Sequence, residues 1–302
     1  MKNNVPIFLG CVENKHEGLS GVKSHKKSVN NKFFGRKEMK NKAYYDRIIA
    51  RLIENSRRNL KSFIFPDEVV PDEFIITDQN AGIPAPPLEN KIPEDATLID
   101  LPVIEDINLG KMPLIEVFKK RSSHREYLPE SLTLEELAYL CWSVAGVREI
   151  HPNKIWTKRI SPSGGARHPF ETYLVVQRVE GLEPGIYRYS GLRHKLVLVK
   201  LGDDFGVQLA ETMQAFVKDS AVIFIWTVVP YRNEWRYMFF SAREVAMDIG
   251  HYCENLYLAA ESISAGTCGI AAYDQAFVDR LLEVDGENEF TIYVAPVGKI
   301  GK

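Results

Sequence analysis

The sequence contains few cysteines and no long run of apolar residues. Its four cysteines stand at positions 11, 141, 253 and 268, and no two of them have the C-x-x-C spacing of a redox or zinc site. This distribution favours free thiols over a disulfide framework. Because no apolar run reaches the roughly 20 residues that a membrane-spanning helix needs, we expect no membrane partner. Together these absences predict a reduced, cytoplasmic protein.

The common phosphate-binding motifs of nucleotide folds are also absent. The sequence has neither a strand-GxGxxG-helix nor a GxxxxGK[ST] loop. It does contain two short runs about forty residues apart, R-S-S-H-R at 121–125 and S-P-S-G-G-A-R-H-P at 161–169. The first offers two fixed cations and two hydroxyls without a carboxylate, and the second offers backbone N–H groups on a Gly-Gly turn. We therefore expect a phosphorylated, hydrogen-bonding cofactor, held by side chains and this turn.

Charge is distributed unevenly along the chain. Residues 1–62 hold 15 Lys/Arg and 5 Asp/Glu, whereas the remainder holds 23 and 35. A basic arm of this kind is typical of proteins that bind an acidic partner or nucleic acid. A solvated extension explains the same pattern, because charge-rich ends cannot bury enough apolar surface. We favour the extension and do not expect nucleic acid as a partner.

The chain is expected to divide near residue 100. In residues 1–100, the stripe Ile48, Ile49, Leu52 and Ile53 predicts one helix over 36–60. Residues 66–102 contain seven of the sixteen prolines, which excludes a regular helix or a central strand. We expect an extended connector that lies over a surface. Residues 101–302 form the main domain.

Periodicity in the main domain predicts an α+β fold, with helices around a mostly antiparallel sheet. Thr133 and Glu136 form a capping box at the start of a helix over 134–145. A long helix over 241–264 spans roughly 36 Å, and Met247, Tyr252 and Leu258 on its opposite side indicate a second covered face, which self-association would explain. Further helices are predicted over 113–120, 205–217 and 274–282, and strands over 172–177, 186–189, 195–199, 221–229 and 290–294.

Taken singly, each motif has a simpler interpretation. Alternate residues of an extended segment point the same way, so Arg121, Ser123 and Arg125 could converge on a phosphate. A solvated basic turn explains the same five residues. The Gly-Gly run likewise reads as an ordinary tight turn that leads into a strand. Both alternatives stay open on the residues alone.

The order of the motifs resembles the nitroreductase superfamily, and within it the SagB-type dehydrogenase branch. That order is R-x-S-x-R, capped helix, P-S-G-G-x-x-x-P-x-E, strand, long helix, G-T-C-G-I-x-x-Y-D and P-V-G-K, over about residues 112–300. The resemblance implies a nitroreductase-like homodimer with a long central helix and FMN at the interface. It also implies roles for individual residues. Arg121, Ser122 and Ser123 would contact the phosphate and ribityl chain of FMN, Arg125 would lie at the pyrimidine edge, and Lys299 would contact the phosphate. The flavin of the partner subunit would be contacted by Pro162, Ser163, Gly164 and Gly165. A backbone N–H for the flavin N5 would come from the segment Gly269, Ile270, Ala271 and Ala272.

The implied function is an FMN-dependent oxidoreductase. Hydride would pass through flavin N5 in ping-pong fashion to a small-molecule or peptide substrate, with NAD(P)H as electron donor. Azoline-oxidising relatives have a catalytic Lys-Tyr pair where this chain has Arg236 and Tyr237. Arginine stays protonated and is a poor general base, so Tyr237 is the better candidate to orient substrate or donate a proton.

Substrate contacts are predicted for His168 and Trp235, with aromatic core packing as the alternative for Trp235 and Tyr237. Two functional alternatives remain. One is an azoline (thiazoline or oxazoline) dehydrogenase in peptide natural-product tailoring, with the basic N-terminal region docking a leader peptide. The other is a non-catalytic flavin-binding module.

Overall fold

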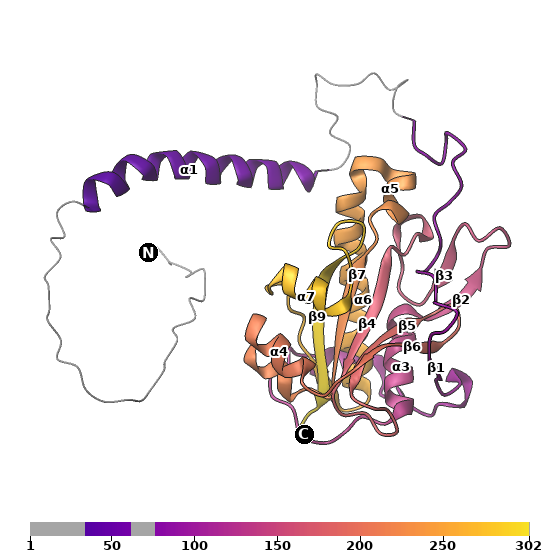
Figure 1. The fold of residues 1–302 in the computed structure, drawn as a ribbon. Helices are drawn as coiled ribbons and strands as arrows, with labels where there is room; N and C mark the ends of the chain where they lie inside the picture. The colour runs from indigo at the N-terminus through magenta and orange to yellow at the C-terminus, as the bar shows by residue number, and fades with distance from the viewer. Residues whose placement is uncertain (1–33, 62–75, 302) are drawn as a thin grey trace, which may run out of the picture. The chain divides into compact units, whose positions relative to one another are not determined.

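An antiparallel sheet of seven strands forms the centre of the computed structural model, which describes residues 34–61 and 76–301 (Figure 1). The strand order is β1-β6-β5-β4-β7-β9-β8, and every neighbouring pair is antiparallel. The predicted α+β class with an antiparallel sheet is therefore confirmed. The strands are Leu98–Asp100 (β1), Phe170–Val176 (β4), Gly185–Ser190 (β5), Lys195–Leu201 (β6), Val222–Val228 (β7), Ala265–Thr267 (β8) and Phe290–Lys299 (β9).

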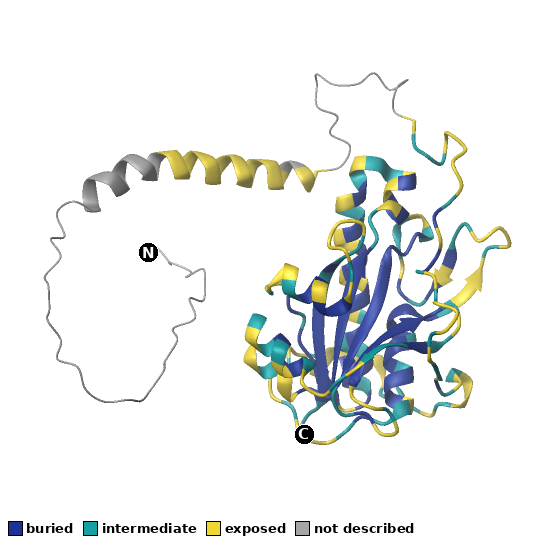
Figure 2. Cartoon of the chain, viewed as in Figure 1, coloured by how far each residue is buried: buried dark blue, intermediate teal, exposed yellow. Residues whose placement is uncertain are grey.

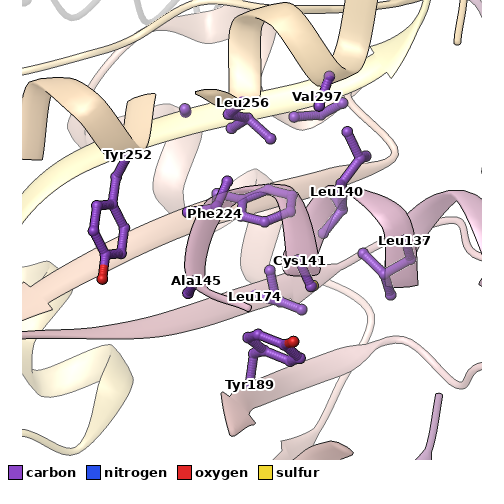
Figure 3. Packing of buried hydrophobic residues seen from close by; sticks show 14 of the residues in the cluster. Leu137, Leu140, Cys141, Ala145, Leu174, Tyr189, Phe224, Tyr252, Leu256 and Val297 are labelled. Atoms are coloured by element: carbon purple, nitrogen blue, oxygen red, sulfur yellow. The ribbon is translucent and has the colours of Figure 1, made fainter. Parts of the chain in front are cut away.

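Helices pack on both faces of this sheet, and central strand β7 contributes to both cores. Phe224 and Trp226 join a cluster with α3 and α6, whereas Ile223 and Ile225 join a second cluster with α4 and α7. Strands β4, β5 and β7 are accordingly buried along their length (Figure 2). Figure 3 shows Phe224 close to Leu256 of α6. The helices are Leu114–Lys120 (α2), Leu134–Ala145 (α3), Phe205–Thr212 (α4), Tyr231–Tyr237 (α5), Ser241–Ser262 (α6) and Gln275–Leu282 (α7).

Local capping fixes the starts of two predicted helices. In α3, the Glu136 N–H donates to Thr133 Oγ1 at 3.1 Å, and the Thr133 N–H donates to the Glu136 carboxylate at 3.0 Å. In α7, the Asp274 side chain accepts from the Phe277 N–H at 3.0 Å. The long helix is also present as α6, but Tyr252 on its predicted second face lies in the core. Met247 on that face is 42% exposed.

Two predicted elements end five residues away from the expected position, whereas the ends of the others differ by at most two residues. The helix predicted over 205–217 stops at Thr212, whose carbonyl accepts the Asp274 N–H at 3.2 Å, and a short 3₁₀ helix follows at Ala215–Asp219. The last strand extends beyond Val294 to Lys299. Pro296 is tolerated there because β8 pairs with β9 only from Val297 onward, so no ladder N–H is needed on that side. Periodicity did not predict α5, β8, or the hairpin of Val147–Ile150 (β2) and Thr157–Arg159 (β3).

The described part of the Pro-rich connector, residues 76–102, contributes to the fold of the sheet domain. Strand β1 pairs with β6, and Leu88 and Glu89 are buried. The guanidinium of Arg159 donates to the Leu88 carbonyl at 3.0 Å. The segment therefore packs into the domain just before the boundary predicted at residue 101. The basic run over residues 1–33 lies outside the described residues.

Helix α1, Phe34–Asn59, is described by itself because the chain divides into two units at residues 57 and 58. It confirms the helix predicted over 36–60. Its stripe Ile48, Ile49, Leu52 and Ile53 is exposed. No helix in the described ranges combines the length and apolarity needed to cross a bilayer.

Candidate functional site

The predicted arginine–serine run follows α2 and lies alongside strand β8, far from it in sequence. Ser123 forms a parallel bridge with Thr267, whose carbonyl accepts the His124 N–H at 3.0 Å. The His124 imidazole packs over Gly266, where a Cβ would lie 2.6 Å from the ring. This close approach brings the run next to the predicted segment 269–272.

Tyr257 of α6 connects the two segments. Its hydroxyl accepts the Gly269 N–H at 2.8 Å and lies 3.0 Å from Ser123 Oγ. The Arg121 guanidinium stands over its ring, 5.5 Å from the centroid. We call Arg121, Ser123, Arg125, Tyr257 and Gly269 the arginine–serine cluster. Sequence reasoning missed Tyr257, because helical spacing counted it only as a member of the apolar stripe.

The two arginines of this cluster are available to an anion. No ion pair in the described part of the chain engages Arg121 or Arg125. Arg125 is exposed, and its Nη1 donates to the Ser123 carbonyl at 3.4 Å. Guanidinium groups without a carboxylate partner suit phosphate, which accepts bidentate hydrogen bonds.

The segment 269–272 offers two free backbone donors beside the cluster. The Gly269 N–H is bound by Tyr257, and the Ile270 N–H donates to the Val294 carbonyl at 2.7 Å. Ala271 and Ala272 are exposed, and no protein acceptor within the described residues engages their N–H groups. If one N–H of this segment binds a ligand, it belongs to Ala271 or Ala272.

The predicted Gly-Gly turn lies against α6 and is held by Asp248. Ser163 Oγ donates to Asp248 Oδ2 at 2.6 Å, and the Gly164 N–H donates to the same carboxylate at 3.1 Å. Burial raises the pKa of the Asp248 carboxyl. The Gly164 N–H thus already has a partner within the chain. Asp248 was missed, although a carboxylate at helical spacing between Val245 and Tyr252 could have signalled a buried polar contact.

The predicted catalytic pair lies at the same turn. A Cβ on Gly165 would lie 2.5 Å from Tyr237 Oη and 3.0 Å from Arg236 Cδ. The Arg236 guanidinium is 5.7 Å from the Tyr237 ring centroid, and its side chain is exposed. We call Ser163, Gly164, Gly165, Tyr237 and Asp248 the glycine-turn cluster.

This contact predicts that Gly165→Ala destabilises the protein. Gly165 has φ 56°, and Gly181 has φ 74° with open space around it. Left-handed backbone alone costs an alanine about 1 kcal/mol, so Gly181→Ala is the matched control. We expect Gly165→Ala to lose roughly 2 kcal/mol in urea unfolding, because Tyr237 must also move. Equal losses in the two variants would contradict the contact.

The two predicted substrate residues are buried. Trp235 is 4% exposed, donates from Nε1 to the Ile83 carbonyl at 2.8 Å, and lies under the Arg167 guanidinium. His168 is 2% exposed, with Nε2 3.0 Å from the Thr157 carbonyl. Burial lowers the pKa of His168 to about 3. Within this chain both side chains pack in the core, which fits the alternative given for Trp235, and a substrate role for either stays a prediction.

Lys299 lies close to α3. Its ammonium pairs with Glu136, the carboxylate of the capping box. Its assignment to a phosphate therefore stays a prediction, and in this structure its charge already has a partner.

The two clusters lie on different sides of α6. Asp248 and Tyr257 are nine residues apart, which is about 13 Å along the axis and about half a turn around it. A pocket of roughly 770 Å³ opens elsewhere, between α5, the start of α6 and β9, and no predicted site residue lines it.

The sequence of this chain matches a known protein family. The sequence model of the Nitroreductase family matches residues 118–299, a range that includes both clusters. The chain belongs to the nitroreductase family. This confirms the resemblance drawn from the order of the motifs.

Individual relatives cover different parts of the chain. Nitroreductase MJ1384 of Methanocaldococcus jannaschii is 32% identical over 207 residues, 68% of this chain and 98% of its own length. Trifolitoxin-processing protein TfxB of Rhizobium leguminosarum bv. trifolii is 29% identical over 134 residues, 42% of this chain and 36% of TfxB. A nitroreductase-like structure from Anabaena variabilis has 26% identity and a TM-score of 0.56, covering 69% of this chain and 42% of that one.

Proposed function

We propose that this nitroreductase-family protein is an FMN-dependent oxidoreductase that acts as a homodimer and takes electrons from NAD(P)H. The observation that carries the proposal is the arginine–serine cluster. It combines two arginines that have no ion-pair partner among the described residues with a serine hydroxyl bonded to Tyr257, and the free N–H groups of Ala271 and Ala272 lie beside it. A phosphate, a ribityl chain and a ring nitrogen require these three kinds of group, so the residues fit FMN.

In this proposal the residues divide the cofactor among them. Arg121, Ser122 and Ser123 bind the phosphate and ribityl chain, while Arg125 lies at the pyrimidine edge. Bound FMN supplies the hydride chemistry at its N5 position. The N–H of Ala271 or Ala272 donates to that nitrogen and so fixes the ring orientation. The cation of Arg125 stabilises negative charge at the opposite edge of the ring.

A second copy of the chain would complete the site. The glycine-turn cluster faces away from the arginine–serine cluster on α6, which supports a site built from one cluster of each protomer. In that arrangement Arg236 and Tyr237 reach the substrate over the partner's flavin. Tyr237 orients the substrate or donates a proton, whereas Arg236 stays charged and binds an anionic group.

Peptide azoline oxidation is the second candidate. The match to a trifolitoxin-processing protein favours a peptide substrate. Arg236 argues against the base mechanism of the azoline-oxidising relatives, because a guanidinium does not take up a proton at neutral pH. Oxidation of a thiazoline-containing peptide by the FMN-loaded protein, without NAD(P)H, would favour this candidate.

The proposal is tested by flavin binding and reduction. We expect the purified protein to be yellow or to take up FMN, and the bound flavin to bleach anaerobically with NADH or NADPH. No FMN uptake would overturn the proposal, and uptake without reduction by either donor would favour a non-catalytic flavin module.

One substitution tests the phosphate contact. Arg121→Ala removes a charge-assisted hydrogen bond worth about 1.5–3 kcal/mol, so we expect the Kd for FMN to rise roughly 10- to 100-fold. Arg193→Ala, which removes an exposed arginine in the turn between β5 and β6, is the control and should leave the Kd unchanged. Equal Kd values for the two variants in a fluorescence titration would exclude Arg121 from the site.

A further inference from the structure

The side chain of Tyr257 contacts three other members of the arginine–serine cluster. Its hydroxyl connects the Ser123 hydroxyl to the Gly269 N–H, with distances of 3.0 and 2.8 Å, and its ring lies under Arg121. The other tyrosine hydroxyl of α6, that of Tyr252, lies 3.4 Å from the His168 imidazole and contacts neither Ser123 nor Gly269. Two groups that the proposed function assigns to the cofactor, the Arg121 guanidinium and the Ser123 hydroxyl, thus meet at one side chain together with the first residue of the 269–272 segment.

We propose that Tyr257 is a positioning residue that orients Ser123 as a hydrogen-bond donor toward a bound phosphate and holds the 269–272 segment at the flavin ring. The inference rests on the proposed function, because it concerns the same site. It assigns Tyr257 no contact with the cofactor itself.

The direction of this hydrogen-bond chain is fixed at Gly269 and is assigned by the proposal at Ser123. The Gly269 N–H can only donate, so the Tyr257 oxygen is its acceptor. Either hydroxyl can donate in the contact between Tyr257 and Ser123, and the proposal assigns the single phenol proton to Ser123 Oγ. With a lone pair of Ser123 bound to Tyr257, the serine proton is free to donate to a phosphate oxygen. Burial raises the pKa of Tyr257, so the hydroxyl keeps its proton at neutral pH.

The same contacts connect the two ends of the cofactor site. Gly269 immediately precedes Ile270, whose N–H and carbonyl both bond to Val294 of β9. With Gly269 fixed by Tyr257 and Ile270 fixed by β9, the free N–H groups of Ala271 and Ala272 follow two anchored residues. Tyr257 therefore acts on the phosphate end through Ser123 and on the ring end through Gly269.

The test is Tyr257→Phe, which keeps the ring under Arg121 and removes only the hydroxyl. The matched control is Tyr139→Phe, which removes a hydroxyl 3.1 Å from Ser262 Oγ at the end of α6 and touches neither cluster. Amide hydrogen exchange of the protein without added FMN provides the first measurement. We expect the Gly269 amide to exchange at least tenfold faster in Tyr257→Phe and unchanged in Tyr139→Phe.

FMN affinity provides the second measurement. We expect Tyr257→Phe to raise the Kd about tenfold, equivalent to about 1.4 kcal/mol, with no such change in Tyr139→Phe. Because Tyr257 acts on the phosphate through Ser123, its effect should shrink in a Ser123→Ala background. A purely structural role would instead give additive losses in the double variant.

The outcomes separate this inference from the proposed function. If wild type binds FMN but the Gly269 exchange and the Kd do not change in Tyr257→Phe, the positioning role is wrong and the function stands. Additive losses overturn the route through Ser123. If wild type does not bind FMN, the proposed function and the cofactor role of Tyr257 fail together, whatever the exchange rates show.

Discussion

Replacing Glu171 with alanine is expected to destabilise the protein by about 3–5 kcal/mol, because it leaves buried charges without a counter-ion. The Glu171 carboxylate is 2% exposed and accepts from Arg232 Nη2 at 2.6 Å and from Arg188 Nη1 at 2.9 Å. Burial alone would raise the pKa of Glu171, but Arg232 and Arg188 outweigh it and hold that pKa below its ordinary value. Both guanidinium groups are themselves buried, so neither can turn to water when the carboxylate is removed.

An exposed ion pair is the matched control for this substitution. Glu149 pairs with Lys158 at 2.6 Å in the β2–β3 hairpin, and the two side chains are 50% and 56% exposed. Surface pairs of this kind contribute about 0–1 kcal/mol, so Glu149→Ala should change the free energy of unfolding very little. Urea denaturation of both variants decides the matter. Similar losses for the two would mean that the buried carboxylate is not balanced by its arginines as described.

The effect of Glu171 extends to the start of the sheet domain. The same carboxylate accepts the Asn90 N–H at 2.7 Å, and Arg188 donates to the Asn90 carbonyl at 3.2 Å. One residue earlier, the Glu89 carboxylate accepts from Ser190 Oγ at 2.8 Å and lies 3.7 Å from Arg159. A buried polar network thus attaches residues 89–90 to strands β4 and β5. We expect loss of Glu171 to speed amide exchange at Asn90 as well.

This network could not be predicted from the sequence, so the Pro-rich connector was expected only to lie over a surface. Prolines correctly exclude helix and central strand, but they say nothing about the partners of Glu89 and Asn90. Charged residues in a sequence are normally solvated. The arginines that bury Glu171 are at positions 188 and 232, and no periodicity relates three such distant positions. Tertiary pairing, not local pattern, determines this part of the fold.

Local pattern was sufficient where the cause of the structure is itself local. The capping box at Thr133 and Glu136, the Asp274 cap and the almost wholly apolar run of β7 each depend on neighbouring residues, and each is present. Helix α5 has no such signal. It is short, and its sequence YRNEWRY has no apolar stripe. The local sequence therefore does not predict this helix, which is stabilised by its packing against residues 76–83.

The candidate site shows the same contrast between residues that local sequence predicts and residues that only tertiary contacts reveal. The runs at 121–125 and 162–165 are visible in the sequence because their residue types are unusual together. Tyr257 and Asp248 are not, since helical spacing assigns them to a face of α6 without naming the backbone groups that they bind. Residues that hold a site in place are therefore harder to predict than residues that contact a ligand.

His168 is expected to make the protein sensitive to acid. Burial, followed by the nearby Arg159, lowers the pKa of His168 to about 3, whereas an unfolded histidine titrates near 6.5. Below pH 6.5 the unfolded chain takes up a proton that the folded chain does not. The stability from a neutral His168 is therefore fully present above about pH 6.5 and is lost as the pH falls. At about 1.4 kcal/mol for each pH unit, the loss reaches about 4 kcal/mol at pH 3.

The substitution that tests this is His168→Asn. His168 has φ 45°, a left-handed conformation that asparagine tolerates, but the shorter amide does not reach the position of Nε2, so the bond to the Thr157 carbonyl is lost. We expect the variant to be less stable than wild type at pH 7 but to lose less stability between pH 6.5 and pH 4 in urea unfolding. His194→Asn, the same exchange at another histidine with positive φ, controls for loss of an imidazole. If the free energy of unfolding falls in parallel with pH in wild type and in His168→Asn, the buried imidazole is not the group that titrates. In that case Tyr252 and Thr157 do not enclose it as the structure describes.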